Sequence, residues 1–91
     1  MGGNSSSTNA MDDMIRILTE FQDRQQEMGN MLKREYDIVG AEWDDPQYKN
    51  LGNVICDIYT TLNTSYVQVS ECITKIQLLK GALEEYLRVR I

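Results

Sequence analysis

The residues whose types and spacing could do chemistry are few, and the first are two adjacent acids, Asp44 and Asp45. A carboxylate pair can share general acid and general base work when its surroundings separate the two pKa values. Pro46 follows directly, and proline is favoured at the first position of a helix because no N–H donor is needed there. Asp45 then stands at the N-cap, where a carboxylate accepts from free backbone N–H groups. We therefore expect the pair to start a helix and not to catalyse a reaction.

The other reactive candidates are two cysteines, Cys56 and Cys72, in a chain without histidine. A thiol needs a neighbouring base to become a nucleophile, and histidine is the commonest base and metal ligand. The sequence also has no glycine-rich phosphate loop and no zinc-ligand spacing. We predict no catalytic residue, metal site, cofactor or enzyme activity. On one helix the cysteines would lie about 24 Å apart, too far for a disulfide, and Cys72 is expected to be buried.

Length and charge narrow the classes of partner. A chain of 91 residues fits one small domain, and such domains often gain stability from a second subunit. The formal net charge is −5 and the nine Lys and Arg residues are dispersed, which argues against nucleic acid. No run approaches the ~18 apolar residues of a membrane span. The first residues have no basic and apolar signal regions, so no Sec-type signal peptide is expected.

Residues 1–10 are Met followed by Gly, Asn, Ser, Thr and Ala, and we expect them to form a disordered N-terminal leader. From Met11, alternate steps of three and four residues select a mostly apolar stripe, which indicates an amphipathic helix. Gly40 is a plausible stop, so helix one is predicted over about 11–41, with a turn at 42–45. The stripe consists of Met11, Met14, Leu18, Phe21, Gln25, Met28, Leu32, Glu35 and Val39.

The same alternation returns after Pro46 and predicts helix two over about 46–90. Both stripes repeat every seven residues, which favours two helices crossing at about 20°. The predicted fold class is therefore all-α, an antiparallel two-helix hairpin over residues 11–91. The second stripe consists of Tyr48, Leu51, Ile55, Ile58, Leu62, Ser65, Val69, Cys72, Ile76, Leu79, Leu83, Tyr86 and Arg90.

Unequal helix lengths predict association. Helix one would be about 46 Å long and helix two about 67 Å, so the apolar end of helix two would lack a partner within the chain. We therefore predict a homodimer or larger assembly, most simply a four-helix bundle. The alternative is that these are isolated surface apolar residues. The predicted partner interface is Tyr66, Ile73, Leu79, Leu83, Tyr86 and Leu87.

The single tryptophan, Trp43, falls in the predicted turn. It could close the end of the two-helix core, with its indole N–H bonded to a local carbonyl. It could also contribute to a partner-binding surface, because tryptophan is enriched at binding hot spots. The two roles are compatible.

A tryptophan in the turn between two long helices, in a chain of this length, resembles the WXG100 (ESAT-6-like) family of type VII secretion. The turn motif is Trp43-Asp44-Asp45-Pro46, with Asp45 where that family has glycine. The family's C-terminal signal is Tyr-X-X-X-Asp/Glu. Here Tyr86 is followed four residues later by Arg90, where the signal has an acid. The resemblance implies a non-enzymatic secreted factor, or a pairing partner or chaperone, that leaves the cytoplasm without Sec. Its partner would be a second copy, a related hairpin or a helical segment of a larger secreted protein.

Two other functions fit the same stripes. A structural coiled-coil component of a phage or larger complex would form extended oligomers instead of a closed dimer. A regulatory, antitoxin-type module would mask a partner protein. The sequence does not separate the latter from a secretion chaperone.

Overall fold

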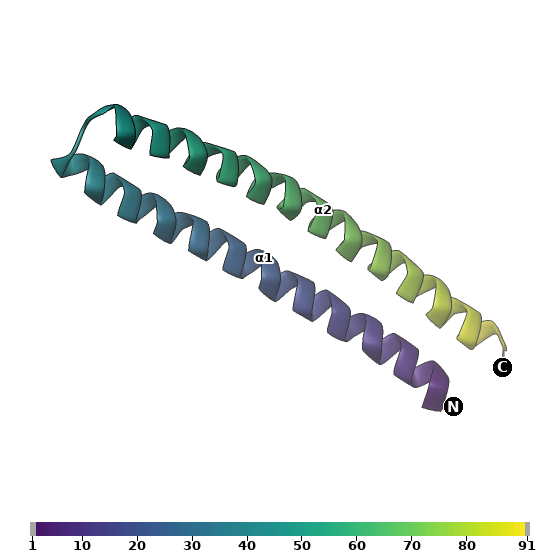
Figure 1. The fold of residues 1–91 in the computed structure, drawn as a ribbon. Coiled ribbons are helices and arrows are strands. Elements are labelled where there is room, and N and C mark those ends of the chain that lie inside the picture. Colours follow the sequence, from purple (N-terminus) through teal and green to yellow (C-terminus); the bar gives the residue numbers. More distant parts are fainter. Residues whose placement is uncertain (1, 91) are drawn as a thin grey trace.

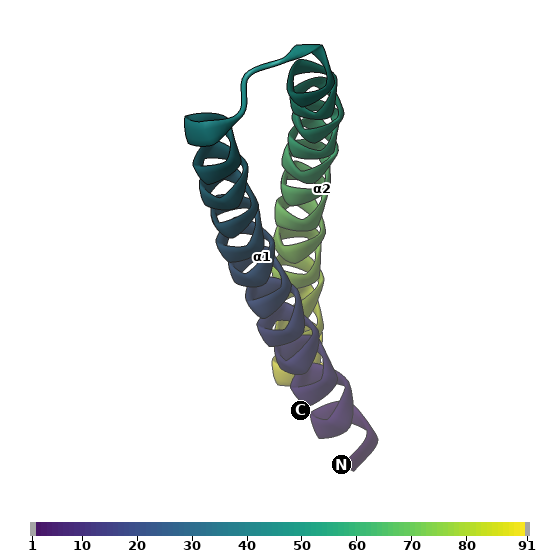
Figure 2. The ribbon, with the colours of Figure 1, turned by 60° about the vertical axis from the view of Figure 1, so that its left-hand side comes forward.

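The computed structural model describes the backbone of residues 2–90 and the side chains of residues 7–89. It contains two helices, α1 (Gly2–Glu42) and α2 (Pro46–Arg90), which run antiparallel and side by side (Figure 1). The turn lies at one end of the hairpin and both chain ends lie at the other, as the view in Figure 2 also shows. The molecule measures 69 × 16 × 13 Å. The prediction of an all-α antiparallel hairpin is confirmed.

Helix α1 begins at Gly2, nine residues before the start expected at Met11. Residues 2–10, expected to be a disordered leader, are therefore helical, while Met1 lies outside the described residues. Next to this segment, Asp12 pairs with Lys80 Nζ of α2 at 2.7 Å, and within it Thr8 is half-buried. A helix that is already nucleated gains one hydrogen bond for each residue added. With 41 residues in α1 and 45 in α2, the expected overhang of helix two disappears.

Helix α2 starts as the sequence indicates. Asp45 Oδ1 accepts a hydrogen bond from the backbone N–H of Tyr48 at 3.0 Å, which is the N-cap arrangement, and Pro46 takes the first helical position. At the other side of the turn, the N–H of Trp43 bonds to the carbonyl of Val39 at 3.0 Å. Only residues 43–45 therefore separate the two helices.

The contact between α1 and α2, called the seam below, differs in register from the predicted stripes. In both helices, every second residue of the predicted stripe is replaced in the seam by the next residue along the chain. Gln22 takes the place of Phe21, for example, and Gly29 takes that of Met28. Because one residue is 100° of rotation, each helix is turned by about 50° from the expected orientation. The buried or half-buried seam residues of α1 are Thr8, Met11, Ile15, Leu18, Gln22, Gln25, Gly29, Tyr36 and Gly40, and those of α2 are Tyr48, Gly52, Ile55, Tyr59, Leu62, Ser65, Tyr66, Val69, Ser70, Ile73, Ile76, Lys80, Leu83 and Leu87.

Two tyrosines and two glycines organise the seam near the turn. The rings of Tyr36 and Tyr48 stack with centroids 4.4 Å apart, and each hydroxyl donates to the other residue's carbonyl, at 3.2 and 3.0 Å. A Cβ on Gly40 would overlap the Tyr48 hydroxyl, and one on Gly52 would overlap the Tyr36 hydroxyl. The two glycines therefore allow the tyrosines to lie between the helices.

The middle of the seam is polar. The amide of Gln22, which is only 8% exposed, donates to the Tyr66 carbonyl at 3.0 Å and to Ser70 Oγ at 2.8 Å. The amide of Gln25 donates to Ser65 Oγ at 3.1 Å. Hydrogen bonds of this kind across a helix pair favour one register, because sliding the helices would leave buried polar groups unpaired.

Candidate functional site

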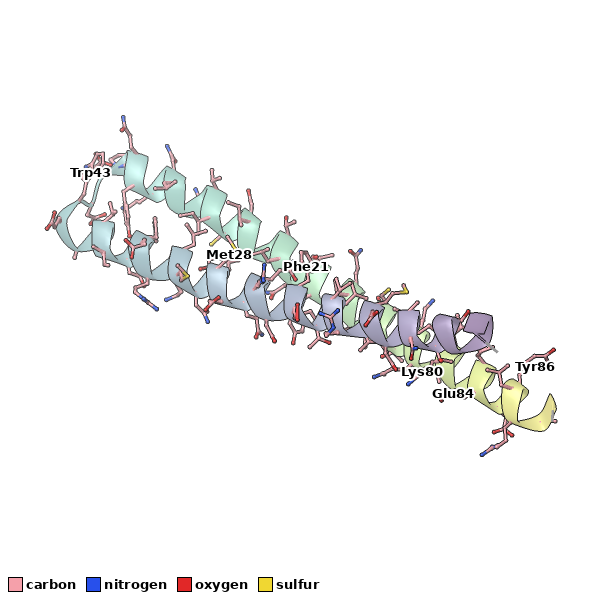
Figure 3. The ribbon with its side chains drawn as sticks, turned by 90° about the horizontal axis from the view of Figure 1, so that it is seen from below. Phe21, Met28, Trp43, Lys80, Glu84 and Tyr86 are labelled. Carbon is pink, nitrogen blue, oxygen red and sulfur yellow. The ribbon has the colours of Figure 1, made fainter. Side chains whose placement is uncertain are left out.

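A band of exposed apolar side chains runs beside the seam and includes residues of both helices. Its members recur at spacings of three, four and seven residues, so they share one face of each helix. We call this band the apolar side; Figure 3 shows Phe21 and Met28 near its middle and Tyr86 near its end. Its exposed residues are Met14, Ile17, Phe21, Met28, Met31, Leu32, Ile38 and Val39 of α1, and Leu51, Val54, Ile58, Leu79, Tyr86 and Val89 of α2.

A groove of about 480 Å³ lies on the apolar side, between the helices. Its apolar lining comes from Phe21, Met28 and Leu32 of α1 and from Ile58 and Leu62 of α2. Among the residues that the structure describes, Arg24 of α1 is its one charged lining residue. An apolar groove between two helices is a typical seat for the apolar face of a third helix. The groove is therefore the part of the molecule best suited to hold a partner.

The opposite side of the hairpin is polar. A groove of about 330 Å³ there is lined by Gln26, Asn30, Asn63 and Tyr59, among others. Because amides and a phenol surround it, water can satisfy this surface. Over residues 7–89 the hairpin thus has two unlike sides, and most of the large exposed apolar side chains lie on the apolar side.

The six predicted interface residues are divided between two places. Leu79 and Tyr86 are exposed on the apolar side, as an interface with a partner would need. The other four are half-buried on the seam: Tyr66 and Ile73 because of the shift in register, and Leu83 and Leu87 because α1 continues beside them. The surplus apolar surface therefore lies along one side of the hairpin and not at its end.

The centre of the apolar side was missed by the sequence reasoning, which placed Phe21, Met28 and Ile58 inside the hairpin. The signal that could have found them was the pair of glycines beside the stripes, Gly29 and Gly52. A Cβ on Gly29 would lie 3.3 Å from a ring carbon of Tyr59, so glycine marks where the helices approach. The same shift leaves Cys72 exposed, contrary to expectation, and Cys56 is exposed too.

The turn presents Trp43 outward. The indole is 51% exposed, and its Nε1–H donates to Asp45 Oδ2 at 2.6 Å. The other carboxylate oxygen of Asp45 caps α2, so one side chain both starts the helix and orients the indole. The indole bonds to a carboxylate and not to a carbonyl, and it does not close the end of the hairpin. Asp44 and Pro46 are exposed beside it.

Two titratable groups in the seam have shifted pKa values. Burial raises the pKa of Tyr48 to about 12, with a further contribution from its hydrogen bond with Tyr36. The hydrogen bond with Asp12 raises the pKa of Lys80, which also faces Glu84 (Figure 3). Both groups therefore stay protonated at neutral pH and act as structural contacts.

No family model, no curated protein and no solved structure matches this chain. Over the part of the chain that the structure describes, no helix combines the length and apolar character needed to cross a membrane. The class that the fold and site define is a two-helix hairpin with one apolar side and an exposed tryptophan at its tip.

Proposed function

We propose that this chain is a non-enzymatic interaction protein that packs its apolar side against the helices of another chain and so completes a four-helix bundle. The observation that carries the proposal is the location of the apolar surface. Phe21, Met28 and Ile58 are each more than 40% exposed, whereas the buried centre of the seam contains Gln22.

The energetics of a two-helix hairpin support this proposal. Only Ile55 and Ile76 are buried apolar side chains among the described residues. Burying apolar surface contributes about 25 cal/mol per Å², so a hairpin without a partner leaves most of this driving force unused. Large contiguous apolar patches on soluble proteins mark interaction sites. A second helical pair over the groove would supply the missing core.

We further propose a WXG100-like role in a type VII-type secretion system, as a secreted factor or as the pairing partner or chaperone of one. The support is the resemblance carried by Trp43 and by the two long helices around it. The 2.6 Å bond from the indole to Asp45 keeps the ring on the surface, where a second protein can contact it. Partners of this role are a second copy, a related hairpin or a helical segment of a larger secreted protein.

The test is co-expression of the chain with the products of its neighbouring genes, followed by mass measurement with multi-angle light scattering. We expect a defined complex that Met28→Ser abolishes and Val67→Ser preserves, because both residues are exposed but only Met28 lines the apolar groove. In the host, we expect the tagged chain or its partner in the culture medium.

A chain that stays monomeric with every neighbouring product, and stays inside the cells, would contradict the secretion role. Extended oligomers in place of a defined complex would support the structural coiled-coil alternative. A complex unaffected by Met28→Ser would show that the apolar side is not the interface.

A further inference from the structure

We infer that the occupant of the apolar side is a different chain whose apolar helical face is flanked by lysine and arginine, and not a second copy of this protein. The inference rests on the proposed function and names the chemistry of the partner. It comes from the charges around the apolar side, which are unevenly distributed over the hairpin.

On α1, acids follow the outer border of the apolar side. Asp13 and Glu20 lie four residues before and three residues after Ile17, and Glu27 lies four residues before Met31. Residues at these spacings are neighbours on a helix surface. Glu35 and Glu42 continue the band itself, seven and 14 residues after Met28.

On α2, the border has the same character. Asp57 lies three residues after Val54, and Glu85 lies four residues before Val89. Glu71 lies seven residues before Leu78, an exposed apolar residue at the outer edge of α2. The helical repeat therefore places acids along both long edges of the apolar side.

The net charge of the apolar side and its border equals the net charge of the whole chain. By helical register, eight of the 14 acids lie on the apolar side or its border, with only three of the nine basic residues, Arg24, Arg34 and Lys75. The other six acids are matched by six basic residues on the seam, the turn and the opposite side. The formal charge of −5 is thus distributed along the length of the apolar side and its border, while the groove itself is lined by Arg24.

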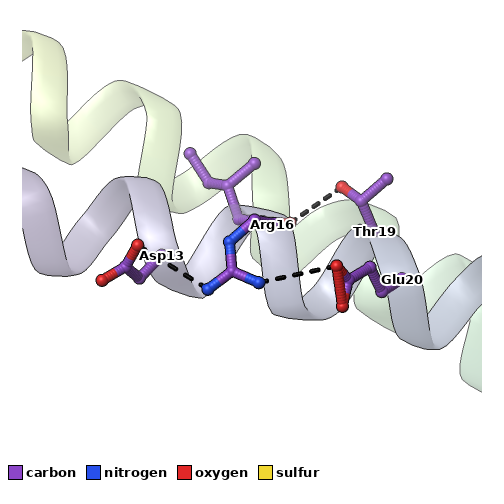
Figure 4. Close-up of polar contacts among 5 residues, drawn as sticks. Asp13, Arg16, Thr19 and Glu20 are labelled. Atoms are coloured by element: carbon purple, nitrogen blue, oxygen red, sulfur yellow. Dashed lines mark hydrogen bonds and ion pairs between the residues drawn. The ribbon is translucent and has the colours of Figure 1, made fainter.

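Ion pairs within the chain neutralise only part of this border. Arg16 contacts Asp13 at 3.8 Å and Glu20 at 3.5 Å, as Figure 4 shows, and Arg88 pairs with Glu85. In the described part of the chain, three border acids take part in no ion pair: Glu27, Asp57 and Glu71.

Two copies packed through this side would bring like charges together. Packed helices have axes about 8–10 Å apart, which is within one Debye length at ~0.1 M salt, so the acidic borders would repel each other. A partner with basic borders would instead meet the unpaired acids and gain favourable steering and specificity. Charge complementarity therefore favours a basic partner over a second copy.

The first experiment measures the mass of the chain alone by multi-angle light scattering at about 0.01 M and about 1 M ionic strength, where the Debye length changes from ~30 to ~3 Å. We expect a monomer at low salt and self-association only at high salt. The variant Glu27→Gln/Asp57→Asn/Glu71→Gln should self-associate at low salt. The control Asp23→Asn/Asp37→Asn/Glu84→Gln removes the same charge elsewhere and should behave as the parent.

The second experiment uses two synthetic amphipathic helical peptides with the same leucine face, flanked by lysine in one and by glutamate in the other. Fluorescence anisotropy should show binding of the lysine peptide, weakened about tenfold by the border variant and little changed by the control. The glutamate peptide should bind far more weakly.

A stable dimer of the parent chain at low salt would overturn the inference, as would equal binding of the two peptides. If association then still depends on Met28, the proposed function survives and only the basic partner is wrong. If neither self-association nor peptide binding responds to Met28→Ser, both the inference and the proposed function fail.

Discussion

The seam and the apolar side lie next to each other on the same two helices, and both contain apolar side chains, but among the described residues only the seam combines them with buried polar contacts. The seam buries the amide of Gln22 and stacks Tyr36 on Tyr48, with glycines opposite the rings. The apolar side leaves Phe21 and Met28 in solvent. Hydrogen bonds, close backbone approach and aliphatic contacts such as those of Ile55 and Ile76 hold the hairpin, while further apolar side chains face outward.

This difference teaches that the register of the two helices and the driving force for association with another chain depend on different surfaces. Buried polar contacts add little net stability but penalise every wrong register. Apolar area is non-directional and supplies the driving force for association. A hairpin built in this way can be aligned by its own seam, and the helical partner proposed above would supply most of the missing core.

The largest expected effect comes from filling the glycine positions of the seam. In the variant Gly40→Ala/Gly52→Ala, each new Cβ overlaps a tyrosine hydroxyl, so the stacked pair must separate. We expect a loss of about 1–3 kcal/mol at each site from overpacking, reduced by up to ~1 kcal/mol of helix propensity. Thermal unfolding followed by circular dichroism measures this. Gly81→Ala meets nothing within 4 Å and should be neutral or stabilising.

The next prediction compares the two surfaces directly. Gln22→Ala should lower the stability of the free chain by about 1–3 kcal/mol, because it leaves the Tyr66 carbonyl and Ser70 without their partner. Met28→Ala should change it by less than about 0.5 kcal/mol, because Met28 is 67% exposed. Urea unfolding at low protein concentration checks both. The reverse order would mean that the apolar side, and not the polar seam, holds the hairpin.

A smaller effect is expected at the turn. Asp45→Ala removes the N-cap of α2 and should cost about 1 kcal/mol. It also frees the indole of Trp43, so the fluorescence anisotropy of the tryptophan should fall. Asp44→Ala is the control, since its carboxylate makes neither contact. Unchanged anisotropy in Asp45→Ala would show that the indole is held by something else.

The smallest effect is an alkaline dependence of stability. The pKa of Tyr48 is raised from 10.0 to about 12 in the folded chain, so the folded state holds this proton more tightly than the unfolded state. The contribution is therefore complete below pH 10 and is lost as the pH rises through about 12. The raised pKa of Lys80 acts in the same direction. Urea unfolding against pH should show a shallower alkaline decline for Tyr48→Phe, and an identical decline would exclude Tyr48 as a cause.

Much of the fold could be predicted because its signals are local. Asp45 and Pro46 specify the start of α2 through one cap and one fixed backbone angle, and the expected cap is present. Spacings of three and four residues identify both helices without any tertiary information. Residues 2–10 were expected to be disordered because their composition is polar, whereas they continue α1, whose helix begins at Gly2.

The candidate site was only partly predictable. Leu79 and Tyr86 were expected at an interface and are exposed on the apolar side. Leu83 and Leu87 were expected there too, but the extended α1 covers them. Phe21 and Met28 were expected in the seam, and they now line the apolar groove.

By itself, the sequence determined two helices, their turn and the presence of more apolar surface than a hairpin can bury. It did not determine which face of each helix packs in the seam, because the stripe through Phe21 and the stripe through Gln22 both recur every seven residues. Only the tertiary structure decided this, through Gln22 bonding to residues 44 and 48 positions away and through glycines that admit tyrosine rings. Such contacts exist only once the helices are paired, so no local pattern along the chain can record them.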